Sequence, residues 1–187
     1  HKNIAKFTFT GSTKVGKILM AQCASTVKKV SLELGGNAPF IVFDDADLDS
    51  AVSHCVATKF RNCGQTCVCT NRIFVHSKVA SAFIEKLEKE IAGLKVADGF
   101  EEGAVIGPMI NKQAVEKMDV FLADATQKGA EVVIGGKQHE LGGCFYQPTL
   151  LLNINDEMRL ANEEIFGPIA TVQQFETEDE VVTKAND

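Results

Sequence analysis

Apolar residues along this chain follow two alternating spacings. Residues 4–9 alternate toward Phe7 and Phe9, a period of two that is typical of strands. From Val15 the apolar positions recur every three or four residues, as in a helix with one buried face. Extended along the chain, these patterns predict strands near 4–9, 30–34, 40–43, 72–76, 132–134, 149–152 and 170–175, and helices that begin near 15, 48, 77, 111 and 178.

The order of these elements indicates a fold class. Strands that alternate with helices are typical of an α/β domain with a largely parallel sheet. Asp47 and Ser77 stand immediately before helical patterns, so we expect them to be N-caps, and another helix should begin at about Asn111. No internal repeat or low-complexity linker interrupts the pattern.

Charge and composition narrow the range of partners. The net charge is −6 with no basic block, which disfavours nucleic acid as a partner. No apolar run approaches the roughly 20 residues that cross a bilayer, so we expect no membrane span. The sequence begins without Met and stops inside its last helical pattern, so we expect it to be a piece of a longer protein.

The first candidate site is the turn at residues 11–18. Its glycine spacing and Lys17 approach a P-loop, but Ile18 stands where the Mg²⁺-binding Ser or Thr belongs, which disfavours a phosphotransferase. A strand–Gly–helix turn can still hold a phosphate on free N–H groups at the helix start. A plain connection between strand and helix fits the local sequence equally well.

The second candidate site is the cysteine-rich segment 63–69. Three thiols could form half of a zinc site, but no second Cys or His pair completes it. The alternatives are a nucleophilic cysteine in a Gly-rich turn and small buried hydrophobic residues. The second alternative fits Cys23, Cys55 and Cys144, which lie on or near apolar faces. A disulfide framework is disfavoured because a chain of this length and core content needs no cross-links.

A cysteine nucleophile usually works with a base. The four histidines share no sequence context with Cys67, so we expect them at the surface and disfavour a papain-like hydrolase. Glu33 is the better candidate, since it ends a strand just before Gly35–Gly36, where the active-site groups of α/β folds collect. Simple solvation of a strand-end carboxylate is the alternative.

Four motifs together resemble the aldehyde dehydrogenase family, in the family's order and over the whole chain. The family's glutamate signature is resembled by Glu33-Leu34-Gly35-Gly36-Asn37-Ala38-Pro39. Its cysteine signature is resembled by Phe60-Arg61-Asn62-Cys63-Gly64-Gln65-Thr66-Cys67, and Cys67 follows Glu33 by 34 positions. Phe9-Thr10-Gly11-Ser12 with Gly16 is similar to the turn before the cofactor helix. Glu163-Glu164-Ile165-Phe166-Gly167-Pro168 is similar to the downstream cofactor motif.

This resemblance implies a reaction and roles for named residues. Cys67 would attack an aldehyde, hydride would pass to NAD or NADP, and Glu33 would activate water to release the acid. No metal is implied. The implied cofactor-binding residues are Ser12, Leu34, Glu164 and Phe166.

Within the family, residues 59–69 most resemble succinate-semialdehyde dehydrogenases, enzymes of 4-aminobutyrate degradation. Ile165 departs from that subgroup, which more often has Thr, so other semialdehyde dehydrogenases stay open. Arg61 lies in this stretch and is predicted to bind a substrate carboxylate through two parallel hydrogen bonds; a surface Arg or a structural ion pair is the alternative. The subgroup resemblance places Cys67 and Cys69 in one loop, so Cys69 is predicted to be a redox partner of Cys67; a Cys69 that only packs in the core is the alternative.

The family resemblance also implies an organisation. Residues 1–34 would be the last part of a dinucleotide-binding domain, and residues 35–187 a catalytic domain truncated at its C-terminus. The intact protein would be a homo-dimer or homo-tetramer, in the mitochondrial matrix of a eukaryote or the cytoplasm of a bacterium. We expect the 187 residues alone to be inactive. A non-enzymatic relative that keeps the fold is the remaining alternative.

Overall fold

The chain divides into two compact units, which we describe separately. The computed structural model describes residues 1–186. The first unit is His1–Gly36 and the second is Asn37–Asp187. The division lies two residues beyond the predicted boundary at 34/35. The assignment of these pieces to a dinucleotide-binding and a catalytic domain stays a prediction.

The smaller unit is one strand–helix–strand element. Strand β1 (Lys6–Thr10) pairs in parallel with β2 (Lys29–Glu33), and helix α1 (Thr13–Ala24) connects them. A Cβ at Gly16 would lie 2.5 Å from the Cδ2 atom of Leu34. A glycine is therefore needed where α1 approaches the end of β2.

The larger unit has a five-stranded sheet with the strand order β3-β4-β7-β6-β5. All neighbouring strands are parallel except β5 and β6, which are antiparallel. This arrangement confirms the predicted α/β fold with a parallel-rich sheet. Its elements are β3 (Pro39–Val42), α2 (Leu48–Phe60), a 3₁₀ turn η1 (Arg61–Gly64), β4 (Arg72–His76), α3 (Ser77–Ala92), α4 (Lys112–Gln127), β5 (Glu131–Ile134), β6 (Thr149–Leu152), α5 (Arg159–Asn162), β7 (Ile169–Phe175) and α6 (Glu178–Ala185).

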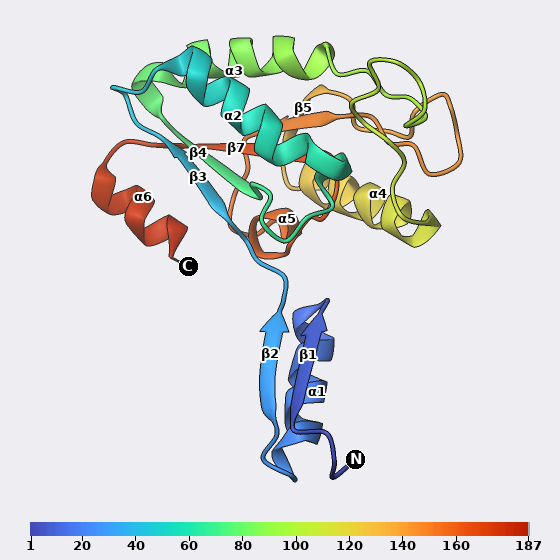
Figure 1. Ribbon diagram of the computed structural model, residues 1–187. Coiled ribbons are helices and arrows are strands. Elements are labelled where there is room, and N and C mark those ends of the chain that lie inside the picture. The colour runs from blue at the N-terminus through green and yellow to red at the C-terminus, as the bar shows by residue number, and fades with distance from the viewer. Residues whose placement is uncertain (187) are drawn as a thin grey trace. The chain divides into compact units, whose positions relative to one another are not determined.

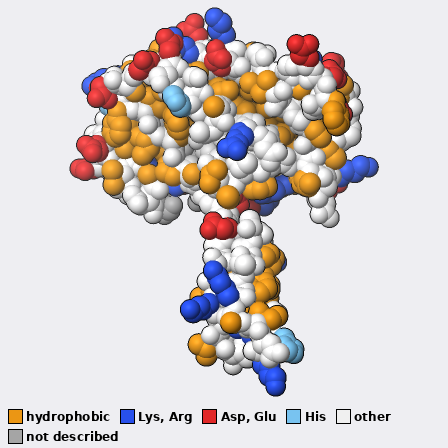
Figure 2. All heavy atoms as spheres, viewed as in Figure 1, with side chains coloured by type: hydrophobic (Ala, Val, Ile, Leu, Met, Phe, Trp, Pro, Cys, Tyr) orange, Lys and Arg blue, Asp and Glu red, His pale blue; other side chains and the backbone are white. Residues whose placement is uncertain are grey.

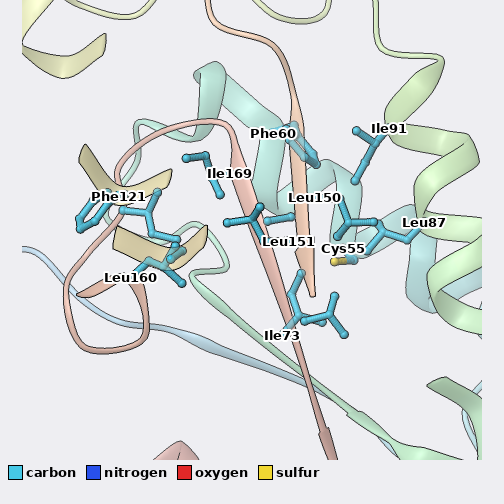
Figure 3. Packing of buried hydrophobic residues seen from close by; sticks show 14 of the residues in the cluster. Cys55, Phe60, Ile73, Leu87, Ile91, Phe121, Leu150, Leu151, Leu160 and Ile169 are labelled. Atoms are coloured by element: carbon cyan, nitrogen blue, oxygen red, sulfur yellow. The ribbon is translucent and has the colours of Figure 1, made fainter. Parts of the chain in front are cut away.

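Helices cover both faces of this sheet (Figure 1). Strand β4 is buried throughout, and its side chains alternate between two apolar clusters. Ile73 and Val75 belong to the large cluster that includes residues of α2 and α3, and Figure 3 labels Ile73, Cys55 and Leu87 among its members. Phe74 packs instead with Phe175 and with Val181 of α6. A strand buried on both faces is typical of the interior of a parallel sheet.

The helix starts agree with the sequence except at α3. Asp47 is the N-cap of α2, where its side chain accepts hydrogen bonds from the N–H groups of Asp49 and Ser50, and Asn111 is the N-cap of α4. Ser77 is not a cap: α3 begins at that residue, and the Nδ1 atom of His76 accepts from the N–H of Lys78 at 3.2 Å. The prediction was wrong because an imidazole nitrogen can serve as the acceptor that a hydroxyl usually supplies.

The surface of the larger unit carries acidic and basic side chains interspersed with apolar ones on the face shown in Figure 2. Within residues 1–186, no helix combines the length and apolar character that crossing a membrane requires.

Candidate active site

The cysteine-rich segment is a strained turn between α2 and β4. Asn62, Cys63 and Gly64 have φ values of 51°, 57° and 71°, three successive left-handed residues of which only the glycine adopts this conformation readily. Reciprocal amide bonds hold the turn: Asn62 Nδ2 donates to the carbonyl of Gln65 at 3.1 Å, and Gln65 Nε2 donates to the carbonyl of Asn62 at 3.2 Å. Gln65 Oε1 also accepts from the N–H of Ile110 at 2.9 Å. The turn is thereby tied to the loop before α4.

Cys67 follows this turn and differs from the other thiols. The structure describes all six cysteines, and among them only Cys67 is exposed. None of the described residues accepts a hydrogen bond from its backbone N–H. Burial raises the pKa of Cys55 and of Cys63 to about 12, which keeps these two thiols protonated at neutral pH. Cys67 is therefore the most exposed of the six thiols, whereas Cys144 is half-buried and the other four thiols are buried.

Cys69 lies beneath the turn. It is 6% exposed, and its Sγ donates to the carbonyl of Gly64 at 3.3 Å. The turn would have to rearrange before Cys69 could meet Cys67.

Arg61 is the first residue of the 3₁₀ turn η1, six residues before Cys67. Its side chain is exposed, and no described residue forms a hydrogen bond or an ion pair with it. A guanidinium in this state is available for an anion, since it is not used in a structural pair.

The segment 163–168 packs directly against the cysteine turn. A Cβ on Gly64 would lie 2.1 Å from the carbonyl oxygen of Gly167, so the two backbones are in contact. Lys117 Nζ donates to the carbonyl of Glu164 at 2.7 Å. Glu164 is half-buried, and Phe166 has a φ of 53° and is 38% exposed. Within the larger unit, the fold thus joins the predicted cysteine and cofactor motifs.

The smaller unit gathers the other predicted site residues at one end. Because β1 and β2 are parallel, Thr10 pairs with Glu33 at the carboxyl ends of both strands, and the carbonyl of Glu33 accepts from the N–H of Gly11 at 3.0 Å. Ser12 caps α1 at the same end, with its Oγ 3.3 Å from the nitrogen of Val15. The Glu33 side chain is exposed, and Leu34 packs on Gly16.

The histidines offer no base at this turn, but one prediction about them was wrong. His76 is buried, with 8% exposure, and packs edge-on to Phe175 with ring centres 5.3 Å apart. It was expected at the surface, yet its strand is covered on both sides. Among the described residues no cluster of three or more His, Cys, Asp or Glu side chains has the geometry to hold a metal ion.

Comparison with known proteins identifies the family of this chain. Residues 1–187 match the aldehyde dehydrogenase family. The chain belongs to the aldehyde dehydrogenase family.

Three aldehyde dehydrogenases illustrate how similar its relatives are. The 3-sulfolactaldehyde dehydrogenase of Pseudomonas putida is 54% identical over 186 residues, which cover 100% of this chain and 38% of that protein. The NADP(+) succinate-semialdehyde dehydrogenase GabD of Escherichia coli K12 is 53% identical over 184 residues, 98% of this chain and 38% of its own length. The succinate-semialdehyde dehydrogenase structure from Burkholderia pseudomallei is 55% identical with a TM-score of 0.99, and the match covers 100% of this chain and 39% of that one. The chain therefore spans about two fifths of these aldehyde dehydrogenases.

Some residues that shape this part of the aldehyde dehydrogenase fold escaped the sequence analysis. Lys117, Asn37 and Asn71 form hydrogen bonds with segments far away in the sequence. Asn37 lies within the glutamate motif, and Asn71 follows Cys67 by four residues. Only this closeness to the motifs could have drawn attention to the two asparagines.

Proposed function

We propose that the protein containing this chain oxidises an aldehyde to a carboxylic acid with NAD or NADP, through covalent catalysis at Cys67. The observation that carries the proposal is the single exposed thiol, which follows a turn fixed against the segment 163–168. A reachable thiol in a held turn is suited to nucleophilic attack on a carbonyl carbon.

The chain's own residues divide the reaction into two steps. The thiolate of Cys67 adds to the aldehyde carbon and forms a thiohemiacetal, whose oxyanion the unpartnered N–H of Cys67 stabilises. A nicotinamide cofactor, when bound, would supply the hydride acceptor, and transfer of hydride from the thiohemiacetal carbon would leave a thioester on Cys67. Glu33 then takes a proton from water and the water oxygen attacks the thioester carbon; the C–S bond breaks, Cys67 leaves as the thiolate and the carboxylic acid is released.

The residues present fit a dinucleotide. The first N–H groups of α1, beside Ser12, are suited to a phosphate because the start of a helix carries partial positive charge. Leu34 would support this turn through its contact with Gly16. The half-buried carboxylate of Glu164 is suited to accept hydrogen bonds from ribose hydroxyls, and the partly exposed ring of Phe166 offers an apolar contact.

The substrate we favour is succinate semialdehyde, whose oxidation to succinate belongs to 4-aminobutyrate degradation. Arg61 supports an aldehyde with an anionic far end, because an uncommitted guanidinium can bind a carboxylate through two parallel hydrogen bonds. The substrate named for the Escherichia coli relative has a carboxylate at that end and the one named for the Pseudomonas putida relative has a sulfonate, so 3-sulfolactaldehyde is one competing substrate, and other semialdehydes are further alternatives. We also propose a homo-dimer or homo-tetramer as the working form.

The test uses the protein encoded by the full reading frame that contains these residues. Cys67→Ala should abolish formation of reduced cofactor, whereas Cys144→Ala should retain it. Glu33→Gln should give a rapid burst of reduced cofactor followed by slow turnover, since acylation precedes the step that Glu33 assists. Full steady-state activity of Cys67→Ala would refute the mechanism. The 187 residues alone should show no turnover.

A further inference from the structure

Asn71 is a buried amide that bonds to two distant segments. It lies just before β4 and is 2% exposed. Its Oδ1 accepts from the N–H of Ile165 at 2.9 Å, and its Nδ2 donates to the carbonyl of Glu163 at 3.3 Å and to the Oδ1 of Asn37. The amide of Asn71 thus supplies both a donor and an acceptor to the backbone of residues 163–165, as a neighbouring strand would.

The partner of Asn71 extends the same network. Asn37 Nδ2 donates to the carbonyl of Ala161 at 3.1 Å, and its own carbonyl accepts from Arg72 Nε at 3.0 Å. The backbone of Asn71 is also fixed, because its N–H donates to Ala38 at 3.0 Å and its carbonyl accepts from Thr171 Oγ1 at 3.2 Å. Residues 161–165 are therefore attached to segments on either side of the cysteine turn.

The residue at the centre of these bonds is Glu164. Asn71 holds the carbonyl before it and the N–H after it, while Lys117 holds its own carbonyl at 2.7 Å. The peptide groups that flank Glu164 are thereby restrained, and Glu164 is a half-buried residue on this restrained backbone.

We propose that Asn71 is a positioning residue that orients Glu164 toward the dinucleotide. This inference rests on the proposed function, because it assigns Glu164 to cofactor binding. A side chain that merely satisfied buried polar groups would affect folding, whereas a positioning residue sets the affinity for the cofactor in molecules that are already folded.

The first measurement uses the full-length protein and needs no activity. Hydrogen exchange of the Ile165 amide should be about tenfold or more faster in Asn71→Ala, because that amide loses its acceptor. Asn162→Ala is the matched control: Asn162 is an exposed amide that donates to the carbonyls of Asp156 and Met158, at 2.7 and 3.2 Å, within the same stretch of chain. It should leave exchange at Ile165 unchanged.

The second measurement uses the full-length protein and NADP or NAD alone. Asn71→Ala should raise the dissociation constant of the cofactor about tenfold, while iodoacetamide alkylates Cys67 at a rate within about twofold of the parent. Asn162→Ala should change neither value. An unchanged dissociation constant in Asn71→Ala, or equal losses in binding and alkylation, would overturn the proposal. A parent that binds neither cofactor would instead refute the proposed function.

Asn71→Asp keeps the inference testable if the alanine variant does not fold. When protonated, the aspartic acid retains one donor and one acceptor; when ionised, it places negative charge beside the oxygens of Asn37 and Glu163. The cofactor dissociation constant of Asn71→Asp should therefore rise with pH relative to the parent. A pH profile parallel to that of the parent would count against the proposal.

Discussion

Replacing Lys59 with methionine is expected to stabilise the larger unit. Lys59 is 0% exposed, and among the described residues its Nζ has no hydrogen-bond partner. It lies on the buried face of α2 between Cys55 and Phe60, whose side chains Figure 3 shows among strand residues of the apolar core. Burial lowers the pKa of Lys59 from 10.5, although its interactions with nearby thiols oppose this shift.

The expected gain in the free energy of unfolding follows from removal of the buried, unpartnered Nζ of Lys59. Leaving a buried polar group without a partner costs about 1–3 kcal/mol. Methionine has a similar unbranched shape, and such a replacement usually costs less than about 1.5 kcal/mol in packing. The net gain at neutral pH should be about 1–2 kcal/mol. With a typical urea dependence of about 2 kcal/mol per molar, the midpoint of unfolding should rise by about 0.5–1 M.

The gain should also depend on pH. Because the pKa of Lys59 is lower in the folded chain than in the unfolded one, unfolding takes up a proton between these two values. The free energy of unfolding of the parent should therefore rise with pH, by at most about 1.4 kcal/mol per unit, and fall as the solution is acidified. Lys59→Met lacks this dependence, so its advantage should shrink as the pH rises. The buried thiols act in the opposite direction only above their ordinary pKa of 9.0.

The assay can use the chain's only tyrosine. There is no tryptophan, and Tyr146 is 0% exposed in the same apolar cluster as Cys55, so its fluorescence reports unfolding of the larger unit. Urea titrations between about pH 6.5 and 7.5, at least about one unit below the ordinary cysteine pKa of about 8.5, keep cysteine ionisation small. Lys86→Met is the control, because Lys86 is an exposed lysine paired with Asp49, and it should leave both the midpoint and its pH dependence unchanged. A Lys59→Met variant less stable than the parent at every pH would refute this reasoning.

Three further predictions concern the cysteine turn. In the full-length enzyme, Arg61→Ala should raise the KM for succinate semialdehyde about tenfold or more and spare an uncharged aldehyde of similar length; equal losses would make Arg61 structural. After dilute peroxide and then a thiol reductant, the parent should regain activity and Cys69→Ala should not, because the Cys69 thiol would condense with the sulfenic acid of Cys67, releasing water and forming a reducible disulfide. Equal recovery of both would exclude the redox pair. Gly64→Ala should destabilise the fold by about 2 kcal/mol or more in urea titrations, through its positive φ and its collision with Gly167, whereas Gly99→Ala, with nothing within 4 Å, should change it by less than about 0.5 kcal/mol. A Gly64→Ala chain as stable as the parent would contradict the contact.

The sequence predicted the regular elements because their signals are local. A short apolar run located β6 at Thr149–Leu152, and an aspartate before a helical pattern located the start of α2. Helix α5 was missed because its four residues, Arg159–Asn162, are too few to show a period. The 3₁₀ turn was missed because the positive φ values of Asn62 and Cys63 are not accompanied by any periodic spacing of apolar residues.

The site was predictable only as far as its motifs extend. The exposure of Cys67 fits its expected role, but the burial of Lys59 does not follow from its charge, even though it shares a face with Cys55. The bonds of Asn71 depend on contacts across 34 and 94 positions, which a single sequence does not disclose. The roles assigned to the individual site residues stay predictions.

The Asn71 network has a consequence for recombination. A crossover between residues 37 and 71 in a chimera with a relative would give the two bonded asparagines different parents, and one between 71 and 163 would separate Asn71 from the segment around Glu164. Crossovers before residue 37 or after 171 keep the whole network, and the Gly64–Gly167 contact, from one parent. Residues 37–171 should therefore be exchanged as one block when hybrid proteins are built.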